Sequence, residues 1–282
     1  MAQKVWLITG ASRGFGAEMS KAVLASGDKL VATARNATSL EHLGNTGAGG
    51  NSNLLAVALD VTDETQAREA VQAALNHFGR IDVLVNNAGY GLMGAVEESS
   101  AAEVERLYRT NVFGLLNMIR AVLPSMRKQG AGHIINFSSL GGYSSAPGFG
   151  VYCSTKFAVE GITEALHGEV APLGIHATVV EPGYFRTDFL DTSSLAETAA
   201  RIPDYAATVG KVREFAAAHN HQQPGDPVRL GQAIVELAHA ATPPLRLPLG
   251  TDTLRRIAEK NSFVQAEAEK WRALSASTDY PI

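Results

Sequence analysis

The chain has 282 residues, of which 45% are hydrophobic and 18% charged, and its formal net charge is −4. This composition predicts a soluble globular protein with one sizeable core, and the absence of Lys/Arg blocks argues against a nucleic-acid partner. A single cysteine, Cys153, excludes an internal disulfide and a cysteine-rich metal site.

The sequence also lacks the features of a membrane or exported protein. No apolar run approaches the roughly 20 residues that a membrane helix needs. The chain enters the segment KVWLITG almost at once, which does not fit a signal peptide. We therefore expect a cytoplasmic protein without membrane contact. The eight histidines show no spacing typical of metal ligands, so we expect no bound metal.

Short, almost continuously hydrophobic segments alternate with longer helical patterns along the chain. Such segments form strands that are covered on both faces of a parallel sheet, and we predict them at 4–9, 29–34, 54–60, 81–87, 133–139 and 176–182. Helical patterns are clearest at 63–79 and 100–130. This alternation predicts one α/β domain over residues 1–282, a doubly wound (Rossmann-type) parallel sheet with helices on both faces.

Three segments depart from the alternation. The Gly- and Asn-rich stretch GNTGAGGNSN at 44–53 predicts a mobile surface loop. Residues from about 188 to 226 follow the sixth strand and contain Pro203 and Pro224, so we expect a lid over a site. Residues from about 254 to 277 predict a C-terminal amphipathic helix.

The segment TGASRGFG at 9–16 follows the first strand and opens a helix. Its glycines permit a tight turn and let the backbone approach a pyrophosphate, whose charge a helix N-terminus favours. A plain strand-to-helix turn is the alternative, but the position after the first strand favours dinucleotide binding. We assign the whole loop to the cofactor: Gly10, Ser12, Arg13, Gly14, Phe15 and Gly16.

The end of the second strand indicates which dinucleotide binds. NAD-binding proteins usually carry Asp or Glu there, to accept hydrogen bonds from the ribose hydroxyls. Here Ala34 and Arg35 occupy the position, and Arg13 adds a second cation. A 2′-phosphate would meet two guanidiniums and no repelling carboxylate, so NADP(H) is favoured over NAD(H). Alternatively, both arginines merely face solvent.

Two further segments fit the same cofactor, because ligands bind at the carboxyl ends of parallel strands. Asp60 and Val61 end the third strand and could border the adenine. The motif NNAG ends the fourth strand, and we expect it to face the middle of the dinucleotide through Asn86, Asn87, Ala88 and Gly89.

Tyr152 and Lys156 lie four residues apart, which would place them on one face of a helix. The pair alone would also suit an ordinary surface helix. Together with TGASRGFG, NNAG, Asn111, Ser138–Ser139 and Pro182–Gly183, in matching order and spacing, it resembles the short-chain dehydrogenase/reductase family in its roughly 250-residue form. The resemblance spans residues 4 to about 190 and again 225–250.

This resemblance implies an oxidoreductase that acts on CH–OH groups. Tyr152 would be the general acid in carbonyl reduction and the general base in alcohol oxidation. A free phenol titrates near 10, and we expect the Lys156 cation to favour the phenolate while also holding the cofactor ribose. Ser139 would hydrogen-bond the substrate oxygen, and Asn111 would hold a water against Lys156.

The resemblance extends to the segment after the sixth strand. Pro182 and Gly183 would face the nicotinamide, and Thr187 would hold its carboxamide. We expect Ser138 to be structural, because the spacing to Tyr152 matches Ser139 instead. We also expect Cys153 to be structural, because the residue after Tyr152 on a helix points about 100° away from it.

The predicted substrate pocket is mostly apolar, and Arg186 is its one candidate carboxylate ligand. We expect its lining to be Tyr90, Leu92, Met93, Tyr143, Phe149, Phe185 and Phe189. This set predicts a medium-sized apolar or aromatic ketone, aldehyde or secondary alcohol as the small-molecule substrate.

Two alternatives remain open. A sugar-nucleotide epimerase or dehydratase shares Y-x-x-x-K but usually carries G-x-x-G-x-x-G and a larger C-terminal domain, and a non-catalytic NADP(H)-binding sensor tends to lose the tyrosine or serine. Members of the family often associate through helices equivalent to 100–129 and 151–172, so we expect a homodimer, with the tail after 254 obstructing a tetramer.

Overall fold

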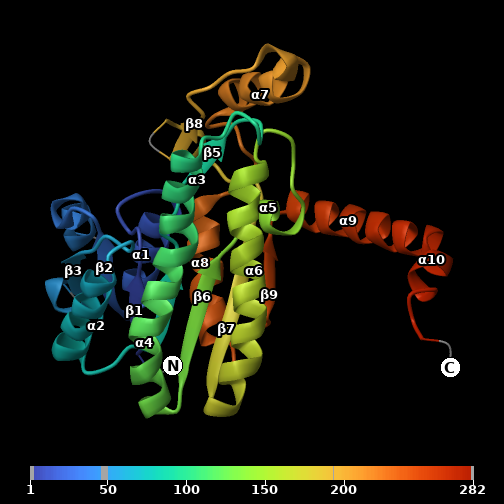
Figure 1. The fold of residues 1–282 in the computed structure, drawn as a ribbon. Coiled ribbons are helices and arrows are strands. Elements are labelled where there is room, and N and C mark those ends of the chain that lie inside the picture. The colour runs from blue at the N-terminus through green and yellow to red at the C-terminus, as the bar shows by residue number, and fades with distance from the viewer. Residues whose placement is uncertain (1–2, 46–49, 193, 281–282) are drawn as a thin grey trace.

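The computed structural model describes residues 3–45, 50–192 and 194–280, and a seven-stranded parallel sheet lies at its centre (Figure 1). The strand order is β3-β2-β1-β4-β6-β7-β9, which confirms the doubly wound sheet. The order reverses between β1 and β4, where a doubly wound sheet binds its ligands. The strands are β1 Val5–Ile8, β2 Lys29–Ala34, β3 Leu54–Ala58, β4 Val83–Asn86, β6 Gly132–Phe137, β7 Ile175–Pro182 and β9 Arg246–Leu249.

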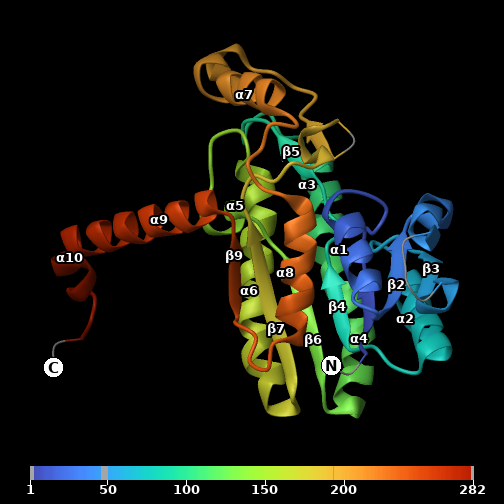
Figure 2. The same cartoon turned by 180° about the vertical axis from the view of Figure 1, so that it is seen from behind.

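Helices cover both faces of this sheet (Figures 1 and 2). One layer holds α2 (Glu64–Phe78), α4 (Leu115–Gln129) and α6 (Gly150–Val170); the other holds α1 (Gly14–Ala25) and α8 (Pro227–His239). Strand β1 shows why both layers form, because its side chains alternate between the faces. Leu7 joins the core beneath α2, α4 and α6, while Trp6 and Ile8 join the core beneath α1 and α8, and all three are fully buried.

The six predicted strands are present, with ends shifted by at most two residues, but the sequence did not indicate β9. Strand β9 is short and contains Pro248, which argues against a strand inside a sheet. It is paired only with β7, at one edge of the sheet. A proline is tolerated at an edge because one side of the strand makes no ladder hydrogen bonds.

The predicted helix over 100–130 is divided into three parts. Helix α3 (Ala101–Tyr108) starts at a capping box that Ser100 forms with Glu103, and α4 ends at Gln129, with Gly130 as its left-handed C-cap. Between α3 and α4 the segment Arg109–Gly114 is π-helical, and Asn111 lies in it with its side chain buried. Wide turns of this kind commonly occur at functional sites.

Segment 188–226 lies beyond the carboxyl ends of the strands (Figure 1). It contains β8 (Leu195–Glu197), which pairs with β5 (Gly91–Met93) in a second, two-stranded sheet, and helix α7 (Lys211–His219). Short helical turns complete it at Asp188–Leu190, Pro203–Tyr205 and Ala206–Gly210.

A buried carboxylate holds this segment to the body of the protein. Glu98 is 1% exposed and accepts hydrogen bonds from the backbone N–H of Ala95 (2.8 Å) and Ile202 (2.8 Å) and from Arg213 Nη2 (2.6 Å). The hydrogen bonds from Ala95, Ile202 and Arg213 lower the pKa of Glu98 to about 2. The carboxylate therefore stays charged at neutral pH and fixes both Ile202 and Arg213.

The predicted C-terminal helix is present as α9 (Thr251–Lys270) followed by the short α10 (Arg272–Ala276). It projects away from the sheet (Figures 1 and 2), and Phe263, Trp271 and Leu274 are more than half exposed. Across the described ranges, no helix is both long and apolar enough to span a membrane.

Part of the predicted loop at 44–53 lies within the described residues. Its described residues belong to two short 3₁₀ helices, Ala37–Asn45 and Gly50–Asn53, while residues 46–49 lie outside the described ranges. Two more short helices complete the chain, α5 (Leu140–Tyr143) and the 3₁₀ turn Ala171–Leu173.

Candidate active site

A cavity of about 1670 Å³ opens at the carboxyl ends of the strands. Its lining runs from the glycine loop and the end of β2 past β4, β6 and α6 to segment 188–226 and the first turns of α9. A single small-molecule site occupies roughly 300–1,000 Å³. The cavity therefore has room for two ligands side by side, as a reaction between a cofactor and a substrate requires.

The glycine loop is shaped to receive an anion. Gly10 and Gly14 have φ values of +67° and +53°, which side-chain-bearing residues rarely adopt. No side chain caps the start of α1 after Arg13, and its first turn has no acidic residue. The N–H groups of that turn are thus available to a pyrophosphate. The loop lines the cavity through Gly10, Ser12, Arg13, Gly14 and Phe15.

Gly16 does not line the cavity, although we predicted it among the cofactor ligands. It is buried under the loop, where a Cβ atom would lie 2.1 Å from the carbonyl oxygen of Gly10 and 2.8 Å from Asn87 Nδ2. Its role in the structure is to let α1 approach the loop closely.

The end of β4 is tied to the same loop. Asn87 Nδ2 donates to the carbonyl oxygens of Thr9 (2.9 Å) and Gly10 (3.1 Å), and the N–H groups of Asn87 and Ala88 both donate to Thr9 Oγ1 at 3.0 Å. Asn87, Ala88 and Gly89 line the cavity. These contacts set the positions of the two segments that would flank the middle of a dinucleotide.

At the far end of the cavity, Arg13 and Arg35 are both exposed and both face the same space. Asp60 and Val61 line the cavity nearby. The Asp60 carboxylate also accepts hydrogen bonds from the N–H and hydroxyl of Thr62, at 2.9 and 2.8 Å. Sequence reasoning missed two polar lining residues that follow Arg35, namely Asn36 and Ser39.

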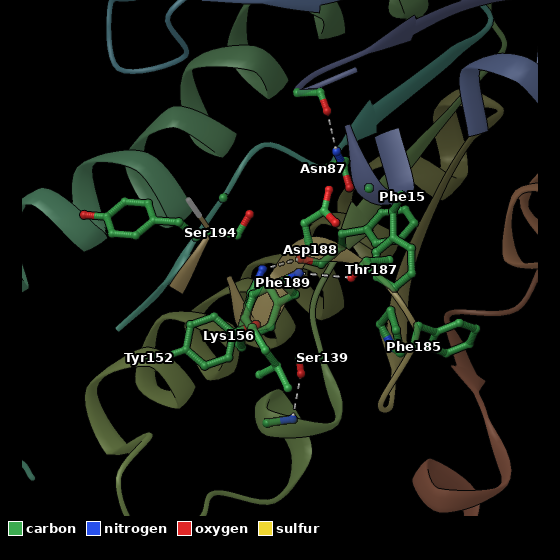
Figure 3. Close-up of a pocket in the computed structure, with 18 of the residues that line it drawn as sticks. Phe15, Asn87, Ser139, Tyr152, Lys156, Phe185, Thr187, Asp188, Phe189 and Ser194 are labelled. Carbon is green, nitrogen blue, oxygen red and sulfur yellow. Dashed lines mark hydrogen bonds between the residues drawn. The ribbon is translucent and has the colours of Figure 1, made fainter. Parts of the chain in front are cut away.

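Helix α6 brings Tyr152 and Lys156 to the floor of the cavity, as the spacing predicted (Figure 3). They are 8% and 7% exposed, and Lys156 Nζ lies 5.9 Å from the centre of the Tyr152 ring. The amine donates to the carbonyl oxygen of Phe137 at 2.9 Å. Ser139 lines the cavity with them, and its Oγ accepts a hydrogen bond from the N–H of Gly141 at 3.0 Å.

Burial controls the protonation of both groups. It raises the pKa of the Tyr152 phenol above its usual range, and the hydrogen bond with Ser139 only partly opposes this. Burial also lowers the pKa of Lys156 to about 8, against the opposing charge of Glu160. Besides burial, the groups that shift the pKa of the phenol are Ser139, Cys153 and Tyr184. That the Lys156 cation favours the phenolate therefore stays a prediction. At neutral pH the phenol is a proton donor.

Asn111 reaches the site from the π-helical segment but does not line the cavity. Its Nδ2 donates to the carbonyl oxygen of Tyr90 (2.9 Å) and to Thr155 Oγ1 (3.2 Å), and its Oδ1 accepts from the N–H of Tyr90 (3.1 Å). A Cβ atom at Gly89 would lie 3.1 Å from Asn111 Oδ1 and 3.8 Å from Lys156 Nζ. The glycine therefore keeps space open between these two polar groups.

The segment after β7 forms the opposite wall. A Cβ atom at Gly183 would lie 2.3 Å from Asp252 Oδ2, and the same carboxylate oxygen accepts the N–H of Tyr184 at 2.8 Å. The start of α9 is thereby attached to this wall, a feature that sequence reasoning missed. The cavity is lined here by Pro182, Gly183, Thr187, Asp252, Arg255 and Arg256.

Aromatic side chains surround Tyr152. The rings of Phe149 and Phe189 lie 6.3 and 5.6 Å from its ring, centre to centre. Four of the predicted lining residues are in the cavity wall: Tyr90, Phe149, Phe185 and Phe189. The wall also includes apolar residues that we did not predict, chiefly Tyr184, Leu190 and Phe215.

Other predicted positions lie elsewhere. Leu92 and Met93 are 3% exposed; Leu92 packs in a buried cluster with Leu107, Tyr152 and Cys153, and Met93 in one with Leu195 and Ala216. The Tyr143 hydroxyl donates to Asn261 Oδ1 at 2.5 Å outside the cavity. The side chain of Arg186 donates to the carbonyl oxygen of Gln223 (3.3 Å) and does not line the cavity, so it is not a carboxylate ligand.

Asn86 likewise faces the interior of the sheet. Its Nδ2 donates to Asn136 Oδ1 on the neighbouring strand at 2.9 Å, and the residue is 6% exposed. The prediction that Asn86 faces the dinucleotide is wrong. Its side chain points toward the neighbouring strand β6, whereas the residues after the end of β4 line the cavity.

A sheet of this order, a glycine loop and a Tyr–Lys–Ser group together define a class of enzyme. The family model of the short chain dehydrogenases matches residues 4–198, and the chain belongs to that family of oxidoreductases.

Relatives match over almost the whole chain. "Oxidoreductase BOA17" of Botryotinia fuckeliana is 39% identical over 98% of this chain and 99% of its own. The 3-ketodihydrosphingosine reductase of Bacteroides thetaiotaomicron is 38% identical over 89% of each chain. A short-chain dehydrogenase crystal structure from Streptomyces avermitilis superposes with a TM-score of 0.90 at 39% identity, covering 99% of this chain and 100% of that one.

Structures similar to this one carry nicotinamide cofactors of both kinds. The 3-ketoacyl-(acyl-carrier-protein) reductase of Brucella melitensis is complexed with NADH (TM-score 0.72, 28% identity, 87% of this chain and 96% of that one). ElxO has NADP bound (TM-score 0.74, 28% identity, 90% of this chain and 100% of that one). The glycine loop described above, with its left-handed turns and uncapped helix, fits such a dinucleotide.

Proposed function

We propose that this protein is an NADPH-dependent carbonyl reductase, working in reverse as an alcohol dehydrogenase. The observation that carries the proposal is the position of the Tyr152 phenol. It lies, protonated and buried, on the floor of one cavity that has an anion-binding loop at one end and aromatic walls at the other. Such a phenol can donate a proton to a carbonyl oxygen as that oxygen gains charge.

The other polar groups have roles that follow from their positions. Bound NADPH would supply the hydride. Gly10, Ser12, Arg13, Gly14 and Phe15 would hold its phosphates, and Lys156 would donate hydrogen bonds to the nicotinamide ribose. Ser139 would donate to the substrate oxygen. Asn111 and the space beside Gly89 would lead protons toward Lys156. Pro182, Gly183 and Thr187 would place the nicotinamide against the wall after β7.

The aromatic walls support a medium-sized apolar or aromatic ketone, aldehyde or secondary alcohol as the substrate. Burial of apolar substrate surface would provide about 25 cal/mol per Å² of the binding free energy. We expect NADPH oxidation, followed at 340 nm, to be fastest with such substrates in a panel of carbonyl compounds. A preference for short charged keto acids would contradict this substrate class.

Arg35 and Arg13 support NADPH over NADH, because both line the cavity beside the glycine loop and the end of β2, where the adenosine ribose would lie. Replacing Arg35 with alanine removes a charge-assisted hydrogen bond, and we expect the KM for NADPH to rise by about tenfold to a hundredfold. The KM for NADH should hardly change and is the internal control. Equal increases for both cofactors would show that Arg35 does not recognise the 2′-phosphate.

Segment 188–226 we propose as a lid, because Phe189, Leu190 and Phe215 face the cavity from it. We also propose a homodimer through the helices of residues 100–129 and 151–172. Phe113 and Phe157 support this, since they are 52% and 45% exposed on these helices. Sedimentation equilibrium should show a dimer that Phe157→Glu dissociates; a monomeric wild type would contradict the assembly.

A further inference from the structure

A group of charged side chains lies behind Lys156, on the side away from the cavity. Glu160 follows Lys156 by one turn of α6, Glu181 lies on β7 and Arg246 on β9. Arg246 Nη1 contacts Glu160 Oε2 and, at 2.9 Å, Glu181 Oε1; its Nη2 contacts Glu164 Oε2 at 2.8 Å. None of these four residues lines the cavity, and no sequence motif indicated them.

The two inner carboxylates are not fully balanced by the arginine. Glu160 is 6% exposed and Glu181 1% exposed, whereas the side chain of Glu164 is 63% exposed. Within the part of the chain that the structure describes, Glu160 Oε1 and Glu181 Oε2 are buried without a hydrogen-bond partner. Burial, together with the charge of Glu181, raises the pKa of Glu160 above its usual range, although Ser138 and Arg246 oppose this. The neighbouring groups therefore influence whether Glu160 carries its negative charge.

Glu160 also lies close to two neighbouring elements, the short helix α5 that follows Ser139 and the turn of α6 that carries Lys156. At Gly142, the position of an added Cβ atom would be 2.2 Å from Ser138 Oγ, 3.0 Å from Glu160 Oε1 and 3.1 Å from the carbonyl oxygen of Lys156. The carboxylate thus packs directly beneath the turn of α6 that presents Lys156. The negative charge of Glu160 also opposes the effect of burial, which lowers the pKa of Lys156.

We propose that Glu160 is a positioning residue that keeps the Lys156 amine charged, and that Glu181 and Arg246 set the charge present on Glu160. The inference rests on the proposed function, in which Lys156 donates hydrogen bonds to the cofactor. The other ionisable or charged groups around the pair come from every adjacent element: Tyr152, Cys153 and Glu164 on α6, Tyr90 after β4, Tyr143 on α5, Glu181 and Tyr184 at the end of β7, Arg246 on β9, and Asp252 and Arg256 on α9.

The sign of the effect follows from the charges. Burial lowers the pKa of Lys156 to about 8, and the negative charge of Glu160 opposes this lowering. Glu160→Gln keeps the shape but removes the negative charge, so the amine should lose its proton at a pH about one unit lower. If activity needs the charged amine, the fall in activity at alkaline pH should therefore begin at a lower pH in this variant. Glu164→Gln removes a charge from the same arginine at an exposed position and is the matched control.

The test measures kcat/KM for carbonyl reduction against pH for wild type, Glu160→Gln and Glu164→Gln. We expect the alkaline limb of Glu160→Gln to move about one unit toward neutrality, with Glu164→Gln unchanged and Glu160→Asp close to wild type. An unmoved limb in Glu160→Gln, or equal shifts in both glutamine variants, would overturn the proposal.

A second measurement needs neither cofactor nor turnover. In wild-type protein labelled with ¹³C-lysine, the Lys156 Cε resonance, assigned by its loss in Lys156→Arg, is followed by NMR against pH. We expect a main step near pH 8 and a smaller step at lower pH as Glu160 takes up its proton. A single step would contradict the coupling even if Glu160→Gln does not fold. A wild type without reductase activity would refute the proposed function, while this titration would still decide the coupling.

Discussion

Tyr152→Phe is expected to lower kcat for carbonyl reduction by about 10²- to 10⁴-fold, because the variant lacks the proton donor on the cavity floor. NADPH should still bind with nearly unchanged affinity, since the loss is one hydroxyl that faces Ser139 rather than the glycine loop. Initial rates of NADPH oxidation and the fluorescence of bound NADPH measure the two quantities separately. A change in kcat without a change in cofactor affinity is the signature of an acid that acts in the chemical step.

Tyr143→Phe provides a matched control for this experiment. It removes the same atom from a tyrosine on the neighbouring helix α5, whose hydroxyl contacts Asn261 outside the cavity. We expect wild-type kcat in this variant. If Tyr152→Phe kept wild-type activity, another acid would have to be sought. A wild type that binds NADPH but turns over no substrate in a broad panel would favour a cofactor-binding sensor.

Gly16→Ala is expected to cause the largest loss of cofactor binding among single-methyl changes. The new Cβ atom would lie 2.1 Å from the carbonyl oxygen of Gly10, which is backbone and cannot turn aside. The loop and the start of α1 must separate, at a cost in the free energy of unfolding of about 1–3 kcal/mol or more. We expect the Kd for NADPH to rise by more than about tenfold and the melting temperature to fall.

The control for this change is Gly168→Ala on α6. Nothing lies within 4 Å of an added Cβ atom there, and the residue is exposed in the last turn of the helix. Because alanine favours a helix over glycine by about 1 kcal/mol, this variant should be as stable as the wild type or more so. Unchanged NADPH affinity in Gly16→Ala would show that the loop does not hold the cofactor by close approach of α1.

The sequence predicted the sheet well because its strands are buried on both faces. Trp6, Leu7 and Ile8 all read as hydrophobic, and that continuity distinguishes them from a surface strand. The same criterion failed for β9, whose residues are half-buried and include Pro248. It also failed for β5 and β8, which are three residues long and pair with each other across about a hundred residues of chain.

The site was predictable where function depends on local spacing. The glycine loop and the Tyr152–Lys156 pair each lie within a few residues, so one strand end or one helix turn fixes their geometry. The assignment of Leu92 and Met93 to the pocket was wrong, because apolar residues near a site also build its supporting core. Tyr143 was also wrongly assigned, because its hydroxyl contacts Asn261 outside the cavity. The contact of Glu160 with Arg246 joins residues 86 positions apart, and no local pattern could indicate it.

Pro248 in β9 affects whether the sheets of two copies of the protein can pair edge to edge. Leu245 and Leu249 turn their carbonyl oxygens toward β7, where they accept from Val179 and Gly183 at 2.8 and 3.0 Å. By alternation, Pro248 turns its backbone to the open side, where it has no N–H to offer. A strand of another molecule that approached this edge of the sheet would lack a backbone N–H donor at Pro248. The residue thus discourages growth of the sheet from one molecule into the next, and so protects against aggregation.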